Sequence, residues 1–195
     1  MESMKKILIV EDHPYLSPMY SRMLTKRGYI ADFVTCGESC LSYLEENTPD
    51  LILLDILMEP MNGWDVLTSI RNNPGTRDIP VIIVTAKPPT INDVRMYGKM
   101  IDGFRLKPFT SGELADLVDR FFSDRSEIEK EVKIAVKSGK KPQNIEEYRS
   151  LAIREQVNSD LLTLLKTLYS YDDNELQEEV LRHRQLKKRI ESLLS

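Results

Sequence analysis

Four short strand-like segments, each followed directly by a polar residue, constrain the fold of this chain most strongly. They cover residues 7–10, 51–54, 81–84 and 104–106. The polar residues that follow them are the acidic pair Glu11-Asp12, then Asp55, Thr85 and Lys107. Apolar runs of this length are typical of strands buried on both faces of a parallel sheet. Because the carboxyl ends of parallel strands meet at one edge of an open sheet, we expect these polar groups to share a pocket.

Helical patterns fill the intervals between these segments. We expect helices over residues 15–26, 37–46, 64–71 and 91–97, and one more strand over residues 30–34. Thr110 and Glu113 form a capping-box pattern that opens a further helix, whose apolar residues continue to Phe122. Five strands alternating with five helices predict an α/β fold, a five-stranded doubly wound parallel sheet covered by helices on both faces.

The pattern changes after residue 123, where no further strand signal occurs. We expect a helix around Ile128, a linker near residues 137–144, a long helix from Asn144 to about Tyr169, and a last helix from about Leu176. Two long helices joined by a short turn form an antiparallel hairpin. The sequence therefore predicts a domain over residues 1–123, followed by an all-α helical hairpin extension over residues 124–195.

The long helix carries an apolar stripe that needs a cover. Leu161, Leu164, Leu168 and Tyr171 repeat at spacings of three and four residues. Either the first domain or another chain would have to cover them, because an exposed apolar patch of this kind marks an interface. We therefore expect the protein to form a homodimer through this hairpin.

Composition excludes several classes of protein. Of the 195 residues 41% are hydrophobic, which is enough for a real core. The net charge is −4 and is carried by the first 123 residues, so a globally basic nucleic-acid binder is excluded. Cys36 and Cys40 are four residues apart on one expected helix, which indicates packing residues. Without a signal-peptide pattern or a long apolar run, the chain is expected to be cytoplasmic, with no membrane association.

The polar residues at the strand ends carry a family resemblance. They are Glu11-Asp12, Asp55, Thr85-Ala86 and Lys107-Pro108-Phe109. In this order and spacing they resemble the receiver domain of two-component response regulators, over about residues 4–123. The resemblance implies a flavodoxin-like receiver fold and a cognate histidine kinase as partner. The sequence from Met58 to Trp64 resembles the corresponding segment of receivers of methanogenic archaea.

The same resemblance implies a role for each site residue. Asp55 would accept a phosphoryl group in the presence of Mg²⁺. The ion would be bound directly by Asp12 and Asp55, through water by Glu11, and by the backbone carbonyl of Leu57. Carboxylate oxygens suit Mg²⁺, and three carboxylates at close range repel one another unless a cation lies among them.

Three further residues have implied roles. Lys107 would pair with Asp55 or its phosphate as a point charge. Thr85 would turn its hydroxyl to the phosphate. Phe104 is either an aromatic switch that moves inward with the threonine or simply a core aromatic. Leu57 is a departure from the family, because an apolar side chain stands where a polar one could orient an attacking water.

Two basic features of the last helix leave alternatives open. His183 could carry a phosphoryl group, although Arg182 and Arg184 flank it where small residues are usual. The five basic side chains of this helix could contact DNA phosphates, but Glu178 and other acidic residues lie in the same helix and no helix-turn-helix pattern occurs. A helical hairpin for self-association or protein docking is the preferred interpretation.

Two functions remain for this sequence. The first is a phosphorylation-switched response regulator whose helical region contacts a downstream protein. The alternative is a transcription regulator whose C-terminal helices contact DNA or the transcription apparatus. We do not expect an enzyme of independent turnover. Aspartate-nucleophile phosphatases need a second Asp two residues after the first, where this chain has Leu57.

Overall fold

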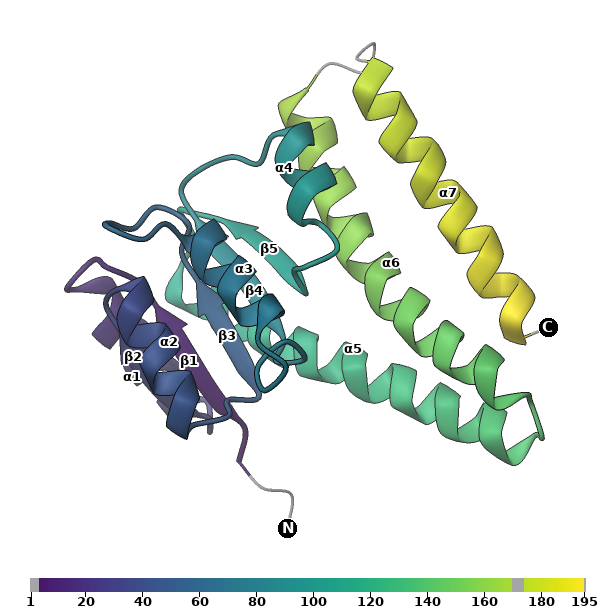
Figure 1. Cartoon of the computed structure of the whole chain (residues 1–195), viewed down its shortest axis with the longest axis horizontal. Coiled ribbons are helices and arrows are strands. Elements are labelled where there is room, and N and C mark those ends of the chain that lie inside the picture. Colours follow the sequence, from purple (N-terminus) through teal and green to yellow (C-terminus); the bar gives the residue numbers. More distant parts are fainter. Residues whose placement is uncertain (1–3, 170–173, 195) are drawn as a thin grey trace. The chain divides into compact units, whose positions relative to one another are not determined.

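The computed structural model describes residues 4–169 and 174–194 of the chain (Figure 1). Tyr171 of the predicted apolar stripe lies outside these residues. The chain divides into two compact units. The first unit comprises the residues up to 88 together with residues 100–116, and the second comprises residues 89–99 and everything from residue 117 onward.

The first unit is built on a parallel sheet of five strands in the described residues. The strands are β1 (Lys6–Val10), β2 (Ile30–Val34), β3 (Leu51–Leu54), β4 (Val81–Thr85) and β5 (Gly103–Leu106), in the order β2-β1-β3-β4-β5. All four neighbouring pairs are parallel. The central strands are buried along their whole length, because helices cover both faces of the sheet. The predicted fold class and strand positions are confirmed.

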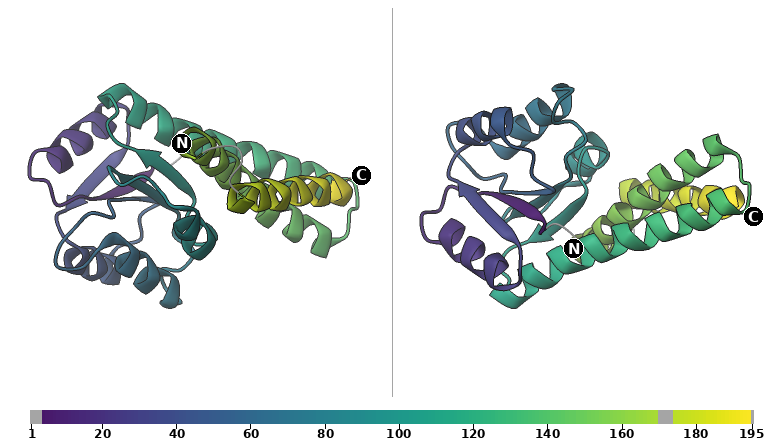
Figure 2. Two further views of the ribbon diagram at one scale, coloured as in Figure 1. Left: turned by 90° about the horizontal axis from the view of Figure 1, so that it is seen from above. Right: turned by 90° about the horizontal axis from the view of Figure 1, so that it is seen from below.

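Helices of the first unit lie on both faces of this sheet. They are α1 (Leu16–Lys26), α2 (Gly37–Glu46) and α3 (Gly63–Asn72). Figure 2 shows α1 on one face and α2 with α3 on the other. The helix α3 begins where the Asn62 side chain accepts a hydrogen bond from the Asp65 backbone N–H at 3.1 Å. Gly28 follows the C-terminal end of α1 and stops the helix, because its φ of 101° is a left-handed conformation that favours glycine.

The helix α5 (Ser111–Lys137) is longer than the sequence interpretation had it. The capping box that opens it is present: the Thr110 hydroxyl accepts from the Glu113 N–H at 3.3 Å, and the Glu113 carboxylate accepts from the Thr110 N–H at 2.7 Å. The expected separation between this helix and the one around Ile128 was wrong. No glycine or proline interrupts residues 113–137, and the apolar stripe continues unbroken past residue 123. Gly139, with a φ of 72°, provides the stop.

The second unit is helical. It contains α4 (Ile91–Tyr97), most of α5, α6 (Pro142–Leu168) and α7 (Asn174–Leu194). Consecutive helices of α5, α6 and α7 run antiparallel (Figure 1). Ion pairs link them, between Arg149 of α6 and Glu129 of α5 at 2.7 Å and between Arg189 of α7 and Glu147 of α6 at 2.7 Å. Two apolar clusters hold the helices together. One comprises Ile128, Val132, Ala135, Ile145, Tyr148 and Leu193, and the other comprises Ile91, Leu162, Leu165 and Leu176.

The predicted stripe of α6 is only partly the buried face. Leu161 is 1% exposed, but Leu164 is half-buried and Leu168 is 41% exposed. Leu165, which the prediction left out, is fully buried. The face of α6 that carries Leu161 and Leu165 packs against the neighbouring helices. The buried face is therefore rotated slightly from the predicted one, which included Leu164 and Leu168. None of the described helices combines the length and the apolar character that a membrane span requires.

Candidate functional site

The carboxyl ends of β1 and β3 hold the two acidic groups of the site. The backbone N–H of Asp55 donates to the carbonyl of Val10 at 2.9 Å, and that of Glu11 donates to the carbonyl of Val34 at 3.2 Å. The sheet hydrogen bonds thus extend one residue beyond each strand. This fixes the backbone of both acidic residues at the point where the strand order reverses, which is where open α/β sheets bind ligands.

Lys107 joins the ends of three strands. Its ammonium lies 2.6 Å from Oδ2 of Asp55 and also forms an ion pair with Glu11. Its backbone N–H donates to the carbonyl of Thr85 at 2.7 Å. The side chains of Glu11, Asp55 and Lys107 are 4%, 7% and 12% exposed, so the three charges interact largely away from solvent. The sequence prediction that these residues share a pocket agrees with this geometry.

Burial and pairing oppose each other in the electrostatics of this cluster. Burial raises the pKa of Glu11, and the neighbouring charge of Asp55 adds to the rise, while Lys107 opposes it. Burial lowers the pKa of Lys107, but its hydrogen bonds to Asp55 and Glu11 outweigh that effect and the pKa lies above its ordinary value. Lys107 therefore remains a cation across the physiological pH range.

Two predicted metal-binding residues lie at the solvent side of the site. Asp12 is exposed, and the Leu57 side chain is 51% exposed. The backbone N–H of Leu57 donates to Oδ1 of Asp55 at 2.9 Å, which orients the carboxylate. Within residues 4–169 and 174–194 no three His, Cys, Asp or Glu side chains are clustered tightly enough to hold a metal. The oxygen donors nevertheless have the chemistry that Mg²⁺ prefers, with Lys107 providing the positive charge between Glu11 and Asp55.

Thr85 and Phe104 are both buried. Thr85 is fully buried, and its hydroxyl accepts a hydrogen bond from the backbone N–H of Lys87 at 3.2 Å. The ring of Phe104 is 8% exposed and so is an inward-facing core aromatic in this structure. Ala86 is exposed, at the start of the loop that leads to α4.

Three residues support the site without having been assigned to it from the sequence. A Cβ atom at Gly63 would lie 2.1 Å from the carbonyl oxygen of Asp55, so only glycine allows the start of α3 to approach the acceptor backbone. The buried hydroxyl of Ser17 donates to the carbonyls of Glu11 and His13 at 3.2 and 3.1 Å. Tyr20 stacks on Phe109 with ring centroids 5.7 Å apart. Of these residues, only Gly63 could have been found from the sequence, by its spacing from Asp55. Ser17 belongs to no recognisable sequence pattern.

This arrangement of strand ends and charges matches a known family. Residues 7–119 match the sequence model described as Response regulator receiver domain. The chain belongs to the response regulator receiver family. Residues 124–193 match a second model, described as Metanogen output domain 2. The resemblance stated from the sequence is thereby confirmed, including its hint of methanogenic archaea.

Relatives of this response regulator agree with the assignment. DNA-binding response regulator MtrA of Mycolicibacterium smegmatis is 34% identical over 115 residues, which are 58% of this chain and 49% of that protein. Response regulator ArlR of Staphylococcus saprophyticus is 38% identical over 111 residues, which are 57% of this chain and 49% of that protein. The chain spans about half the length of the curated relatives that it matches.

Solved structures give the same result for the first part of the chain. The N-terminal domain of a response regulator receiver protein from Methanoculleus marisnigri is 42% identical, with a TM-score of 0.53, over 60% of this chain and 96% of that one. A CheY-like receiver domain protein from Methanospirillum hungatei is 23% identical, with a TM-score of 0.56, over 64% of this chain and 99% of that one, and shows the fold alone.

Proposed function

We propose that this response regulator accepts a phosphoryl group from a phosphohistidine kinase onto Asp55, and that phosphorylation switches protein–protein contacts of the helical region. The observation that carries the proposal is the position of Asp55. It is a buried carboxylate at the switch point of the sheet, with an ammonium 2.6 Å from Oδ2 and a backbone N–H 2.9 Å from Oδ1. A carboxylate held in this way is an oriented nucleophile.

The transfer step balances with the groups of this site. A carboxylate oxygen of Asp55 forms a bond to phosphorus, the bond between phosphorus and the imidazole nitrogen of the kinase breaks, and the imidazole leaves with the electron pair. Phosphoryl transfer needs positioning and charge neutralisation more than covalent assistance. Lys107 supplies one positive charge, and its pairing with both Asp55 and Glu11 allows it to follow the charge onto the phosphoryl oxygens.

Magnesium is the cofactor that these residues would hold. Asp12 and Asp55 would bind it directly, Glu11 through water, and the carbonyl of Leu57 would complete the protein ligands. The ion would neutralise the charge on the transferring phosphoryl group. The exposed position of Asp12 leaves it accessible to an ion that enters from solvent.

The chain is proposed to be a signalling protein without independent turnover. Its own chemistry is limited to accepting the phosphoryl group and losing it slowly to water. Leu57 supports this proposal because its side chain is apolar and 51% exposed beside the acceptor, so it cannot hold an attacking water. The same position lacks the second Asp that aspartate-nucleophile phosphatases use.

We propose a receiver domain over residues 1–123 and a helical output region over residues 124–195, with a linker near residues 137–144. A downstream protein is the proposed output partner. The hairpin would also form a homodimer. The apolar edge of α6 available to a second copy consists of Leu168, which is 41% exposed, and the half-buried Leu164.

DNA binding by the last helix is the alternative, and the ion pairs of α7 disfavour it. Arg182 pairs with Glu179, Lys187 pairs with Glu155 at 3.1 Å, and Arg189 pairs with Glu147. Three of the five basic side chains of this helix are therefore ion-paired within the chain. A phosphoryl-carrying His183 is also disfavoured, because its side chain is 11% exposed and its Nε2 lies 3.2 Å from Glu155.

Chemical phosphorylation tests the proposed function. Incubation of the full chain with acetyl phosphate and Mg²⁺ should add one phosphoryl group, located at Asp55 by mass spectrometry after borohydride trapping. Asp55→Asn should abolish the label, whereas Asp78→Asn, at a side chain 92% exposed in the same unit, should leave it unchanged. Equal labelling of Asp55→Asn and the natural protein would refute the assignment. DNA affinity that falls steeply with salt would favour the alternative function.

A further inference from the structure

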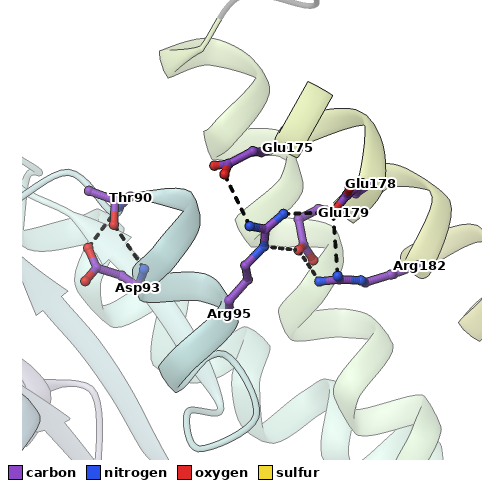
Figure 3. Close-up of polar contacts among 7 residues, drawn as sticks. All are labelled: Thr90, Asp93, Arg95, Glu175, Glu178, Glu179 and Arg182. Atoms are coloured by element: carbon purple, nitrogen blue, oxygen red, sulfur yellow. Dashed lines mark hydrogen bonds and ion pairs between the residues drawn. The ribbon is translucent and has the colours of Figure 1, made fainter. Parts of the chain in front are cut away.

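The helix α4 is tied to α7 by a cluster of charges. The guanidinium of Arg95 lies 3.1 Å from Glu179, 3.0 Å from Glu178 and 3.4 Å from Glu175 (Figure 3). Arg182 joins the cluster through Glu178 and Glu179. The Arg95 and Glu179 side chains are 30% and 12% exposed, so the contact is only partly hydrated.

An apolar contact lies beside this charge cluster. Ile91 of α4 is 4% exposed and packs with Leu165, which is fully buried, and with Leu176 of α7, which is 1% exposed. The partly buried side chains Val94 and Val180 pack against the same cluster. A helix of seven residues thereby buries one face against α6 and α7, which explains why α4 belongs to the helical unit although it lies between β4 and β5 in the chain.

The start of α4 is fixed by a complete capping box. The Thr90 hydroxyl accepts from the Asp93 N–H at 3.0 Å, and the Asp93 carboxylate accepts from the Thr90 N–H at 2.9 Å (Figure 3). A short helix has little stability of its own, so the cap and the contact with α7 are what hold Arg95 in place.

The acidic residues of α7 need a cation. Glu178 and Glu179 lie one turn after Glu175 on α7, and like charges three or four residues apart destabilise a helix. Arg95 forms an ion pair with all three of them. The chemistry of the face is therefore complementary, with a cation and two apolar side chains on α4 and an acidic edge with an apolar flank on α7.

We propose that α4 is a docking surface for α7 of the same chain, and that this α4–α7 latch, formed by Ile91, Val94 and Arg95 with Leu176, Glu175, Glu178 and Glu179, opens when Asp55 is phosphorylated. The coupling rests on the proposed function. The latch is a closed contact of the unphosphorylated protein, and its opening uncovers the acidic edge of α7 and the apolar face of α4 for a partner.

The link between the acceptor and the latch is a short covalent segment. Thr85 ends β4 only five residues before the cap of α4 at Thr90, and its hydroxyl is the acceptor for the Lys87 N–H within that segment. The backbone N–H of Lys107 donates to the carbonyl of Thr85, and its ammonium donates to the carboxylate of Asp55. A phosphoryl group on Asp55 adds three strong acceptor oxygens beside the Lys107 ammonium. When the Thr85 hydroxyl donates to them and turns away from Lys87, the segment before α4 loses the bond that holds it.

Because binding at Asp55 and opening of the latch are thermodynamically linked, the coupling can be measured at the Asp55 site and at the latch. If phosphorylation opens the latch, then opening the latch must favour the phosphorylated conformation by the same factor. Beryllofluoride is a stable mimic of the phosphoryl group and needs no turnover, so its affinity for the full chain with Mg²⁺ reports one end. Hydrogen exchange of the amides in α4 and in the first turns of α7 reports the other end.

Charge reversal supplies the variants. Arg95→Glu should speed amide exchange in α4 and α7 by about tenfold and tighten beryllofluoride binding by a similar factor, within the usual range of coupling. Arg95→Glu combined with Glu178→Arg and Glu179→Arg should restore both. Arg77→Glu, at a residue 60% exposed whose ion partner is the adjacent Asp78, is the control and should change neither. Arg95→Gln gives a milder form of the same change, and exchange in β1 and β3 verifies that the receiver remains folded.

The outcomes separate the two proposals. Beryllofluoride should speed exchange in α4 and α7 of the natural protein and have no effect on Asp55→Asn. If it binds at Asp55, as detected by fluorine NMR, but leaves that exchange unchanged, the latch is not coupled and the proposed function stands. If Arg95→Glu leaves exchange in α7 unchanged, the latch itself is refuted. If Asp55 takes neither beryllofluoride nor a phosphoryl group, the proposed function and the coupling fail together.

Discussion

Different forces stabilise the interior of the first unit, which we call the receiver unit, and the interior of the second, helical unit. In the receiver unit the core is a sheet whose central strands are fully buried, with Leu8, Ile52 and Ile83 inaccessible to solvent. In the helical unit two small apolar clusters are supplemented by ion pairs that cross between helices, such as Arg149 with Glu129 and Arg189 with Glu147. Salt screens partly exposed ion pairs, whereas apolar burial does not depend on the attraction between charges.

The difference suits the two tasks. A phosphoryl-acceptor site needs carboxylates that stay in place, and the backbone hydrogen bonds at the ends of β1 and β3 provide that rigidity. An output region needs contacts that a modest free energy can rearrange, and such elements come from the less stable part of a structure. The single Trp of the chain, Trp64, lies in α3, so its fluorescence reports the receiver unit, while circular dichroism at 222 nm follows the helices.

The largest effect is expected from removing a buried leucine of the helical unit. Leu165→Ala should lower the free energy of unfolding of the helical unit by about 2–5 kcal/mol, because Leu165 of α6 is fully buried in the cluster with Ile91 of α4 and Leu176 of α7. Leu168→Ala, at a side chain 41% exposed, should change it by less than about 0.5 kcal/mol. Urea unfolding followed by circular dichroism measures both. A simultaneous loss in Trp64 fluorescence would show that the units unfold as one and would break the comparison.

A smaller loss is expected in the receiver unit from a single added methyl group. Gly63→Ala should cost about 1–3 kcal/mol, since the new Cβ would lie 2.1 Å from the carbonyl oxygen of Asp55 and must displace the acceptor backbone. Phosphorylation by acetyl phosphate should fall with it. Gly112→Ala is the matched control, because its Cβ meets nothing closer than 4.0 Å. Urea unfolding followed by Trp64 fluorescence provides the measurement, and equal stabilities of the two variants would contradict the close approach.

The pH dependence of the helical unit comes next. Burial, together with a hydrogen bond to Glu131, raises the pKa of Tyr148 from 10.0 to about 12. The folded protein therefore binds this proton more tightly than the unfolded chain does, and the stability that it contributes below pH 10 is lost as the pH rises toward 12. Tyr148→Phe should cost about 1 kcal/mol at pH 8 through the lost hydrogen bond, and this deficit should shrink between pH 10 and 12.

The control for this titration is an exposed tyrosine. Tyr15 is 80% exposed, so Tyr15→Phe should leave the free energy of unfolding unchanged at both ends of the pH range. Urea unfolding followed by circular dichroism at pH 8, 10 and 11.5 is sufficient. A deficit of Tyr148→Phe that stays constant with pH would show that the buried hydroxyl does not govern the alkaline stability of these helices.

The smallest effect is the response to salt. The Arg149–Glu129 pair is partly exposed on both sides and should contribute about 0.2–1 kcal/mol at low ionic strength. Raising the sodium chloride concentration from 50 to 500 mM, roughly from a 14 Å to a 4 Å screening length, should remove most of it from the helical unit. The Arg71–Asp102 pair of the receiver unit, whose side chains are only 17% and 18% exposed, should be screened less than the Arg149–Glu129 pair. An equal salt response of the two pairs would contradict this difference in burial.

The sequence by itself determined the elements and the strand-end residues of the receiver. Strand periods, the capping box at Thr110 and the turn at Gly28 are local signals, and β1 to β5 and α1 to α4 lie within one or two residues of their predicted bounds, whereas α5 extends well beyond its predicted end. The meeting of Glu11, Asp55 and Lys107 was also predictable, because the carboxyl ends of parallel strands must share one edge. The apolar spacing of residues 113–137 is unbroken and agrees with one continuous α5, in place of the two helices that were predicted.

Only the tertiary structure decided which faces find partners. The packing of α4 with α6 and α7 depends on segments far apart in the chain. The same holds for the burial of Leu165 rather than Leu168. A periodic pattern shows that a helix has an apolar side. It does not tell which neighbour covers that side, because the covering residues are chosen by packing across the whole fold.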